Sequence, residues 1–268
     1  GAPAYLSVVP KKMEMEMLMV GGMYAPSDDL TYMGMLMFMK NKMTSNAYKG
    51  SMDRGYLGSF ETNLDDLSNF SFSALYRLIE IDDNRWHLEV GIDKSIGSND
   101  NQGTMLTPMN KFMNMTMPYA MQMDGATRLI SGLTNSRNLN DFVLGSQIKK
   151  YYVIKDKNWA FGDKLEISSW LQKSYDDSLA FSARLLFTKE QKMSGSSSMI
   201  RSPVQSSNPL NFGGRLLEFG LGANKVFNFF EKKHSRVGIE ILFALKNNKN
   251  GLQMDNDYKF VLGYQMSL

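Results

Sequence analysis

The sequence contains no cysteine and only two histidines among its 268 residues. The lack of cysteine excludes disulfide frameworks, thiolate metal sites and cysteine nucleophiles. No run approaches the ~18 consecutive apolar residues that a membrane-spanning helix requires. The net charge of +3 is small and the lysines are scattered, so nucleic acid is not an expected partner.

Apolar and polar residues alternate with period two along several segments, and this alternation predicts β-strands. The clearest segment follows Arg236 and places Val237, Ile239, Ile241, Phe243 and Leu245 on one face. Eleven such segments are readable, at 13–25, 31–42, 69–78, 86–93, 127–136, 142–155, 164–174, 179–188, 217–224, 237–246 and 260–268.

The connections between these segments alternate between short and long. Tight turns are expected at 27–29, 82–84, 138–141 and 175–177, and long links at 41–64, 97–125, 189–213 and 247–257. Short turns on one side and long loops on the other are typical of bacterial outer-membrane barrels, whereas a soluble sandwich has no reason to sort its loops. The sequence therefore predicts an all-β fold, a transmembrane antiparallel up-and-down β-barrel. Residues 1–268 would form one domain in the bacterial outer membrane, surrounded by its lipids.

The same sorting places the end of the last strand in the periplasm and the start of the segment at 13–25 on the outer side. Single-chain bacterial barrels have an even strand number. We therefore expect about 12 strands, the first of which would precede Gly1, with residues 5–9 as the alternative.

Methionine occurs 22 times, mostly in the first half of the chain. Its M-x-M spacing places several thioethers on one face of a strand, and a looser group falls in a long loop. Thioethers are soft ligands that suit Cu(I) or Ag(I); the alternative is that methionine acts as a flexible apolar side chain. The candidate metal ligands are Met33, Met35, Met37, Met39, Met113, Met115, Met117, Met121 and Met123.

A two-residue hairpin loop within 27–29 would place the methionines of the first segment (Met13 to Met19) and those of the second (Met33 to Met39) on opposite faces of the sheet. Glu14 and Glu16 would then join Met33 to Met39 in the lumen, while Met13 to Met19 would face lipid. A three-residue loop would instead place both sets of methionines on the same face.

Charged residues on the polar parity of the strands are expected to line a hydrated, ion-paired lumen. Besides Glu14 and Glu16, they are Arg77, His87, Glu89, Asp93, Glu166, Arg184, Glu218 and Glu240. No familiar catalytic motif is present, so we expect that the protein is not an enzyme. The remaining catalytic hypothesis is an outer-membrane lipid hydrolase that uses His87 with Ser71 or Ser73.

The segment Gly22 to Met33 resembles the M-Y-A-P-[ST]-D-x-L-T-x-M signature of a methionine-rich family of proteobacterial outer-membrane proteins described as transporters. More distantly, the chain is similar to channels linked with the phenol-degradation MetA pathway. Further matches are 72–76 (FSALY), 118–122 (PYAMQ), 208–209 (NP), 213–215 (GGR) and 262–265 (LGYQ). The chain departs from the family in its lysine- and asparagine-rich linkers and in ending on Leu268 instead of an aromatic residue.

The resemblance implies transport or an envelope function with no established substrate. The leading hypothesis is a channel or transporter barrel for a small solute, either a soft metal ion such as copper or silver or a small hydrophobic compound. The alternative is a structural or interaction barrel with a side-chain-filled lumen.

Overall fold

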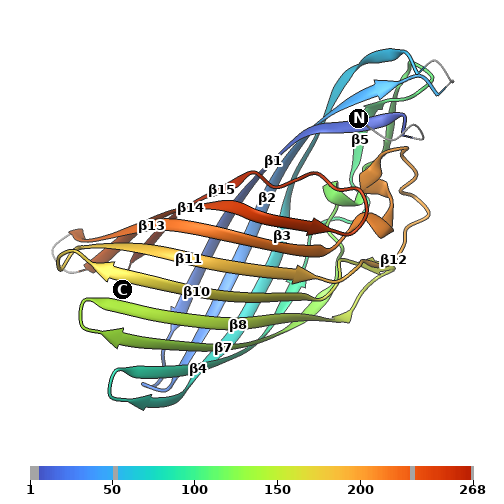
Figure 1. Ribbon diagram of the computed structural model, residues 1–268. Helices are drawn as coiled ribbons and strands as arrows, with labels where there is room; N and C mark the ends of the chain where they lie inside the picture. The colour runs from blue at the N-terminus through green and yellow to red at the C-terminus, as the bar shows by residue number, and fades with distance from the viewer. Residues whose placement is uncertain (1–5, 51–53, 230–232, 267–268) are drawn as a thin grey trace.

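The computed structural model describes residues 6–50, 54–229 and 233–266. Eleven strands form one antiparallel sheet in which each strand pairs with the next along the chain, so the sheet is an up-and-down meander that curls on itself (Figure 1). These strands are β1 (Val8–Tyr24), β2 (Leu30–Tyr48), β3 (Tyr56–Ile81), β4 (Asn84–Ser95), β7 (Thr127–Leu139), β8 (Phe142–Lys155), β10 (Lys164–Ser174), β11 (Leu179–Glu190), β13 (Gly214–Phe229), β14 (Lys233–Lys249) and β15 (Tyr258–Met266).

The predicted all-β, up-and-down architecture with eleven readable strands is confirmed. β1 and β15 are the two edges of the sheet, and no ladder joins them within the described residues. Val8 and Val9 belong to the start of β1 rather than to a separate strand, and position 5 lies outside the described residues. A further strand before Gly1 stays a prediction. None of the helices in the described ranges is long and apolar enough to cross a membrane.

The connections are sorted by length. Two residues separate β3 from β4 and β7 from β8, whereas 31 residues separate β4 from β7. The predicted bounds of the long link at 41–64 are wrong, because β2 continues to Tyr48 and β3 begins at Tyr56. Inner positions of this extended hairpin include Asn41, Ser45 and Thr62, all buried. Their polar character removed the apolar alternation on which the sequence prediction relied.

The long loops fold over the inner face of the extended β2–β3 hairpin. They carry the small hairpin β5 (Gln102–Leu106) and β6 (Phe112–Thr116), the short pair β9 (Trp159–Ala160) and β12 (Ser194–Gly195), and three single-turn helices, η1 (Tyr119–Met121), η2 (Gln205–Ser207) and η3 (Pro209–Asn211). In Figure 1 these elements gather at the end of the sheet opposite the short turns.

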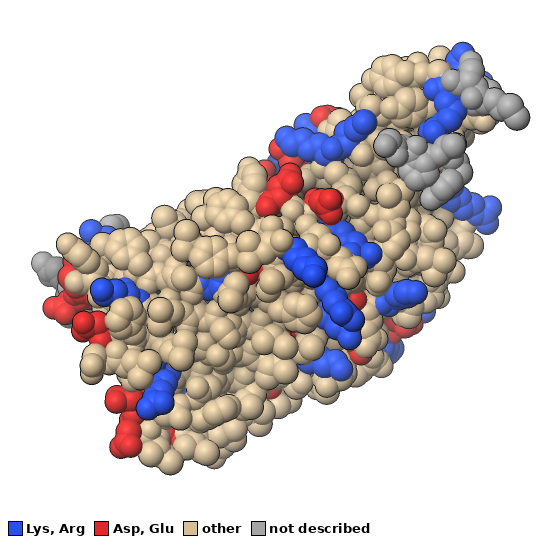
Figure 2. Space-filling view, viewed as in Figure 1, with Lys and Arg blue, Asp and Glu red and all other residues tan. Residues whose placement is uncertain are grey.

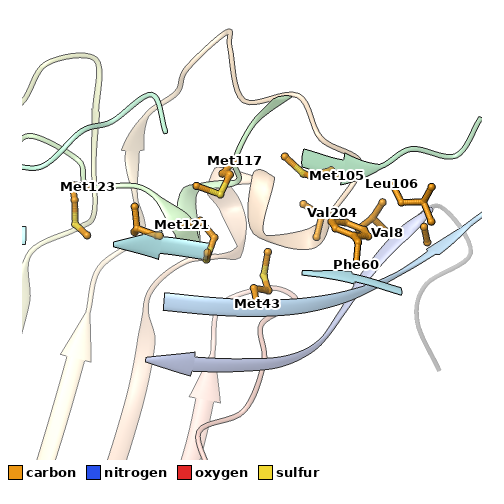
Figure 3. Packing of buried hydrophobic residues seen from close by; sticks show 11 residues of the cluster. Val8, Met43, Phe60, Met105, Leu106, Met117, Met121, Met123 and Val204 are labelled. Atoms are coloured by element: carbon orange, nitrogen blue, oxygen red, sulfur yellow. The ribbon is translucent and has the colours of Figure 1, made fainter. Parts of the chain in front are cut away.

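Apolar side chains join these loops to the strands. A buried cluster, called here the lid core, combines loop and strand residues, several of which are labelled in Figure 3: Val8, Met43, Ala47, Phe60, Leu64, Met105, Leu106, Met117, Met121, Met123 and Val204. A second cluster joins three loops through Tyr119, Trp159, Met193 and Ile200. The aromatic rings of Tyr119 and Trp159 meet edge to face, with centroids 4.8 Å apart. The loops are therefore packed structure rather than loose connections.

The two faces of the sheet have reversed polarity compared with a soluble protein. On the face that carries Phe72, Ile92 and Leu221, large apolar side chains are about half exposed. The opposite face carries polar residues that are buried, such as Glu89 at 5% and Glu218 at 1% exposure. Figure 2 shows a largely uncharged band on this side of the molecule, between charged residues at the left end and a second group of charged residues across the middle and right. We call the polar face the inner face.

Candidate functional site

The methionines of β1 and β2 lie on the same face. The connection between the strands is Ala25–Asp29, five residues long, and the last cross-strand pair is Tyr24 with Tyr32. Odd positions therefore pair with odd positions, and the ladder brings Met17 opposite Met39 and Met19 opposite Met37. The predicted two-residue loop and the opposite-facing methionines are wrong, because an odd loop length reverses the parity relation between the strands. The alternative, a three-residue loop, gave the observed alignment but not the observed loop length.

This register also decides which residues face inward. Met37 continues across the sheet to Asn69, and Met33 to the buried Ser73, on the inner face. Met13 to Met19 therefore face inward, and their predicted position against lipid is wrong. Glu14 and Glu16 alternate with these methionines, so both belong to the outer face and not to the lumen.

The outer position of these two carboxylates is tolerated because basic residues accompany them. Glu14 accepts a 2.5 Å hydrogen bond from the Lys12 ammonium. Across the ladder, Lys42 lies opposite Glu14 and Lys40 lies opposite Glu16. This charged segment lies in the extended part of the hairpin, beyond Leu18 and Phe38, which belong to the apolar part of the same outer face.

The candidate loop methionines differ strongly in exposure. Met117, Met121 and Met123 are 1%, 0% and 5% exposed in the lid core, and Met115 packs against it. Met113, on β6, is 45% exposed. The structure thus brings most of the loop group together with Met39 of β2, which is partly buried against the same core. Figure 3 shows the loop sulfurs in a row above the strands.

Other candidates lie farther along β2, and two residues of the cluster were missed. Met33, Met35 and Met37 lie on the inner face toward the short turn, outside the lid core. Sequence reasoning overlooked Met43 and Met105, which are both buried in it. The signal for Met43 was available, because it continues the odd parity of Met33 to Met39.

Three ion pairs on the inner face each join two strands that have one strand between them, and a fourth pair lies within one strand. Lys149 of β8 donates to Glu89 of β4 at 2.8 Å, reaching past the intervening β7. Lys164 lies 3.0 Å from Glu166 on β10, and Arg184 of β11 is paired with Glu240 of β14. Glu218 of β13 is likewise paired with Lys259 of β15, at 2.8 Å. Acidic and basic groups are thus matched along much of this wall.

The remaining predicted polar residues lie at two levels of the same face. Asp93 accepts a 2.8 Å hydrogen bond from the Asn69 amide. Arg77 lies near the short turns, where it is paired with Asp29 and Glu80, and His87 lies opposite it on β4. Among the described residues, no three His, Asp or Glu side chains gather as a metal site would require.

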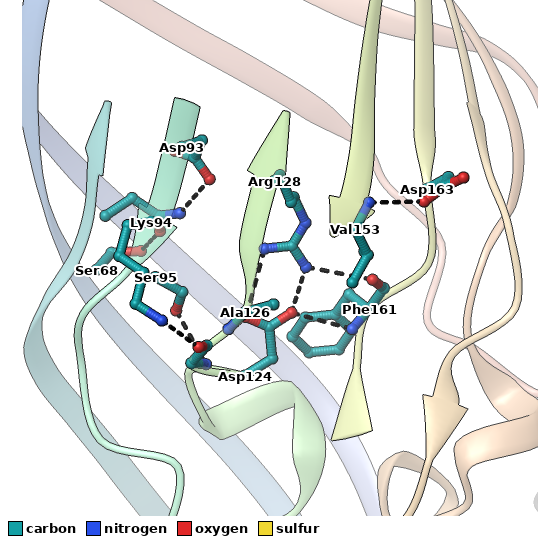
Figure 4. A network of polar contacts seen from close by, with 12 residues as sticks. Ser68, Asp93, Lys94, Ser95, Asp124, Ala126, Arg128, Val153, Phe161 and Asp163 are labelled. Carbon is teal, nitrogen blue, oxygen red and sulfur yellow. Dashed lines mark hydrogen bonds and ion pairs between the residues drawn. The ribbon is translucent and has the colours of Figure 1, made fainter. Parts of the chain in front are cut away.

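A buried carboxylate fixes two of the long loops to the sheet (Figure 4). Asp124 is 2% exposed, is paired with Arg128 of β7, and accepts 3.0 Å hydrogen bonds from the backbone N–H groups of Ala126 and Phe161. The Arg128 guanidinium also donates to the carbonyl of Phe161 at 3.2 Å. Asp124 thereby links the β4–β7 loop to the β8–β10 loop.

The comparisons with known proteins identify similar structures only. No family model matches the chain, and no curated protein matches it. Among solved structures, the chain is similar to in-vitro folded OmpT, an outer membrane protein of Vibrio cholerae, with 10% identity, a TM-score of 0.42 and coverage of 94% of this chain and 95% of that chain. The chain is also similar to outer-membrane expressed OmpT of Vibrio cholerae, with 12% identity and a TM-score of 0.41. That match covers 92% of this chain and 88% of that chain. Likeness at this level says nothing about substrate or reaction.

The expectation that the protein is not an enzyme is withdrawn. It depended only on the lack of a familiar catalytic motif, and that lack does not separate transport from catalysis. The particular hydrolase arrangement considered from sequence is not formed. Ser73 lies opposite Gly91, four residues from His87, which corresponds to about 13 Å along a strand.

Proposed function

We propose that this chain forms the wall of a bacterial outer-membrane β-barrel through which a small solute crosses. The observation that carries the proposal is the reversed polarity of the sheet: exposed apolar side chains on the outer face and buried, ion-paired side chains on the inner face. In water this arrangement would leave a large apolar surface unsatisfied, whereas lipid on one side and a hydrated lumen on the other satisfy both faces.

The outer face supports embedding in lipid in a second way. Near the short turns, Tyr24 lies opposite Tyr32, and Tyr76 lies opposite Leu30, so tyrosines stand side by side at one level. Their exposures are 70%, 37% and 50%. Tyrosine is enriched at membrane interfaces because its ring prefers the apolar side and its hydroxyl the wet side. On this proposal the row marks one boundary of the membrane, and outer-membrane lipids contact the band above it.

The methionine-rich outer-membrane family remains part of the proposal. Its signature segment, Gly22 to Met33, forms the turn of the β1–β2 hairpin and the first inner methionine pair, Met23 with Met33. A signature that combines a turn with inward methionines supports a role of this hairpin in the lumen.

A second candidate, a barrel with a filled lumen, is favoured by the lid core. That cluster covers the inner face where β1, β2 and β3 extend beyond the other strands. The two candidates differ in one measurable property, since only a channel conducts ions or lets solute cross.

The test is conductance of the purified full chain in planar bilayers. The channel proposal expects discrete current steps, and uptake of small solutes into liposomes. No current and no uptake would overturn it and favour the filled barrel.

Two matched variants test whether charges on the inner face set the ion selectivity of the channel. Glu89→Gln removes the partner of Lys149, so the net charge of the inner wall becomes more positive. The selectivity should then shift toward anions, which is measured as a shift of the reversal potential under a salt gradient. Glu61→Gln changes the net charge equally, but Glu61 is half exposed and paired with Lys42 on the outer face. Equal shifts in both variants would contradict the assignment of the inner face as the conducting surface.

A further inference from the structure

The methionines of the first hairpin are confined to one face. Between Met13 and Met23 on β1 and between Met33 and Met43 on β2, the inner positions number twelve, and ten of them are methionine. The ten outer positions within the same two segments contain none; they carry leucine, valine, phenylalanine, glycine, glutamate and lysine. A general preference for a flexible apolar residue would place methionine on the lipid side as well.

Packing accounts for only some of these methionines. Met43 is 3% exposed in the lid core, in the same environment as Met117 and Met121. In contrast, Met17 and Met19 are 52% and 49% exposed. At the neighbouring inner positions of β3 the chain uses Ser71, Ser73 and Asn69, which suit a wet surface. Thioethers exposed on an otherwise polar wall need another explanation than core packing.

Four of the exposed or partly buried methionines stand together, and we call them the thioether quartet: Met17, Met19, Met37 and Met39. Met17 faces Met39 and Met19 faces Met37 in successive inward pairs of the β1–β2 ladder. Residues directly opposite in an antiparallel pair have Cβ atoms about 4.5–5.5 Å apart, and successive residues on one face are about 7 Å apart. Methionine has three rotatable side-chain bonds, so four sulfurs in such a rectangle can turn toward a common point.

We propose that the thioether quartet binds Cu(I) or Ag(I), with Asp66 supplying negative charge beside it. Soft sulfur ligands select soft monovalent ions, and neither cysteine nor a cluster of hard ligands competes among the described residues. Asp66 lies opposite Met39 on the inner face of β3. The proposal rests on the proposed function only in taking the inner face as the lumen. Met15, Met23, Met33 and Met35 flank the quartet as further thioethers along the same wall.

The experiment titrates Ag(I) nitrate, in chloride-free buffer, into the detergent-solubilised full chain labelled with ¹³C at the methionine methyl groups. The expected result is saturable shifts of the methyl signals of the quartet. A competition assay with a Cu(I) chelator measures affinity in parallel. Replacing all four residues by leucine conserves volume, so the barrel should keep its circular dichroism spectrum. Affinity should fall by at least about tenfold.

The matched control replaces Met113, Met115 and Met117 by leucine, and it should keep the affinity of the unmodified chain. Equal loss in both variants, or unchanged affinity in the quartet variant, overturns the site. Binding of an apolar probe such as naphthol without any response to Ag(I) would also overturn it, and would indicate a hydrophobic solute. Bilayer conductance is measured separately, so a chain that binds Ag(I) without conducting refutes the channel and leaves the quartet standing.

Discussion

Replacing Asp124 by asparagine tests whether this carboxylate holds the long loops against the sheet. The Asp124 side chain is 2% exposed and that of Arg128 is 12% exposed, so the charge pair is largely shielded from water. Removing one partner of a buried pair costs roughly 3–5 kcal/mol, and a hydrogen bond to a charged group is worth about 1.5–3 kcal/mol. Asparagine keeps an oxygen for the backbone N–H groups of Ala126 and Phe161. We therefore expect a loss of about 3 kcal/mol.

That loss should appear locally, because Asp124 joins two loops and does not hold the strands of the wall to one another. Hydrogen exchange of the backbone amides in 97–126 and 156–163 should become roughly 100-fold faster, as expected when the opening free energy falls by about 3 kcal/mol. Exchange in β10 and β11 should not change. Mass spectrometry of peptic fragments resolves these segments.

The control is Asp100→Asn, since the Asp100 carboxylate is exposed in the same loop and contacts only Ser98 in the bonds that the structure describes. It should leave exchange in both loops within about threefold of the unmodified chain, because exposed polar substitutions usually change stability by less than about 0.5 kcal/mol. If Asp124→Asn behaved like this control, the loops would be held by the lid core alone, and the role of the Asp124 carboxylate would be refuted.

Three further outcomes are expected. Gly145→Ala should destabilise the barrel by about 1–3 kcal/mol in urea titrations, because a Cβ there would lie 2.1 Å from the Trp170 ring. The control Gly34→Ala, with open space around the added Cβ, should not destabilise it. Equal effects of the two substitutions would contradict this packing. Leu221→Arg should cost about 2–4 kcal/mol in lipid vesicles, and a negligible cost would contradict lipid contact at this half-exposed outer residue. Asp176 accepts hydrogen bonds from its turn, chiefly from the backbone N–H two residues on, which lowers its pKa. Its stabilisation of the turn should therefore be present above about pH 4 and be lost as the pH falls further, so Asp176→Asn should raise turn exchange at pH 7 more than at pH 3.

The local pattern of the sequence was enough to predict the strands, their order in a meander and the sorting of turns from loops. Period-two alternation depends only on neighbouring residues, so it is visible without knowing any long-range contact. It also identified the wall positions of Glu89, Glu218 and Glu240, which share the polar parity of their strands.

The tertiary structure decided the placement of the methionines. Whether Met17 faces Met39 depends on a single residue of loop length between β1 and β2, and sequence alone does not determine that length. Burial of Met117 and Met121 depends on a loop folding back onto β2 and β3, a contact between residues distant in sequence. Sequence therefore established that thioethers line up on strands and in a loop. The fold established that most of the loop group forms a core and that the strand group lies on the inner face of the sheet.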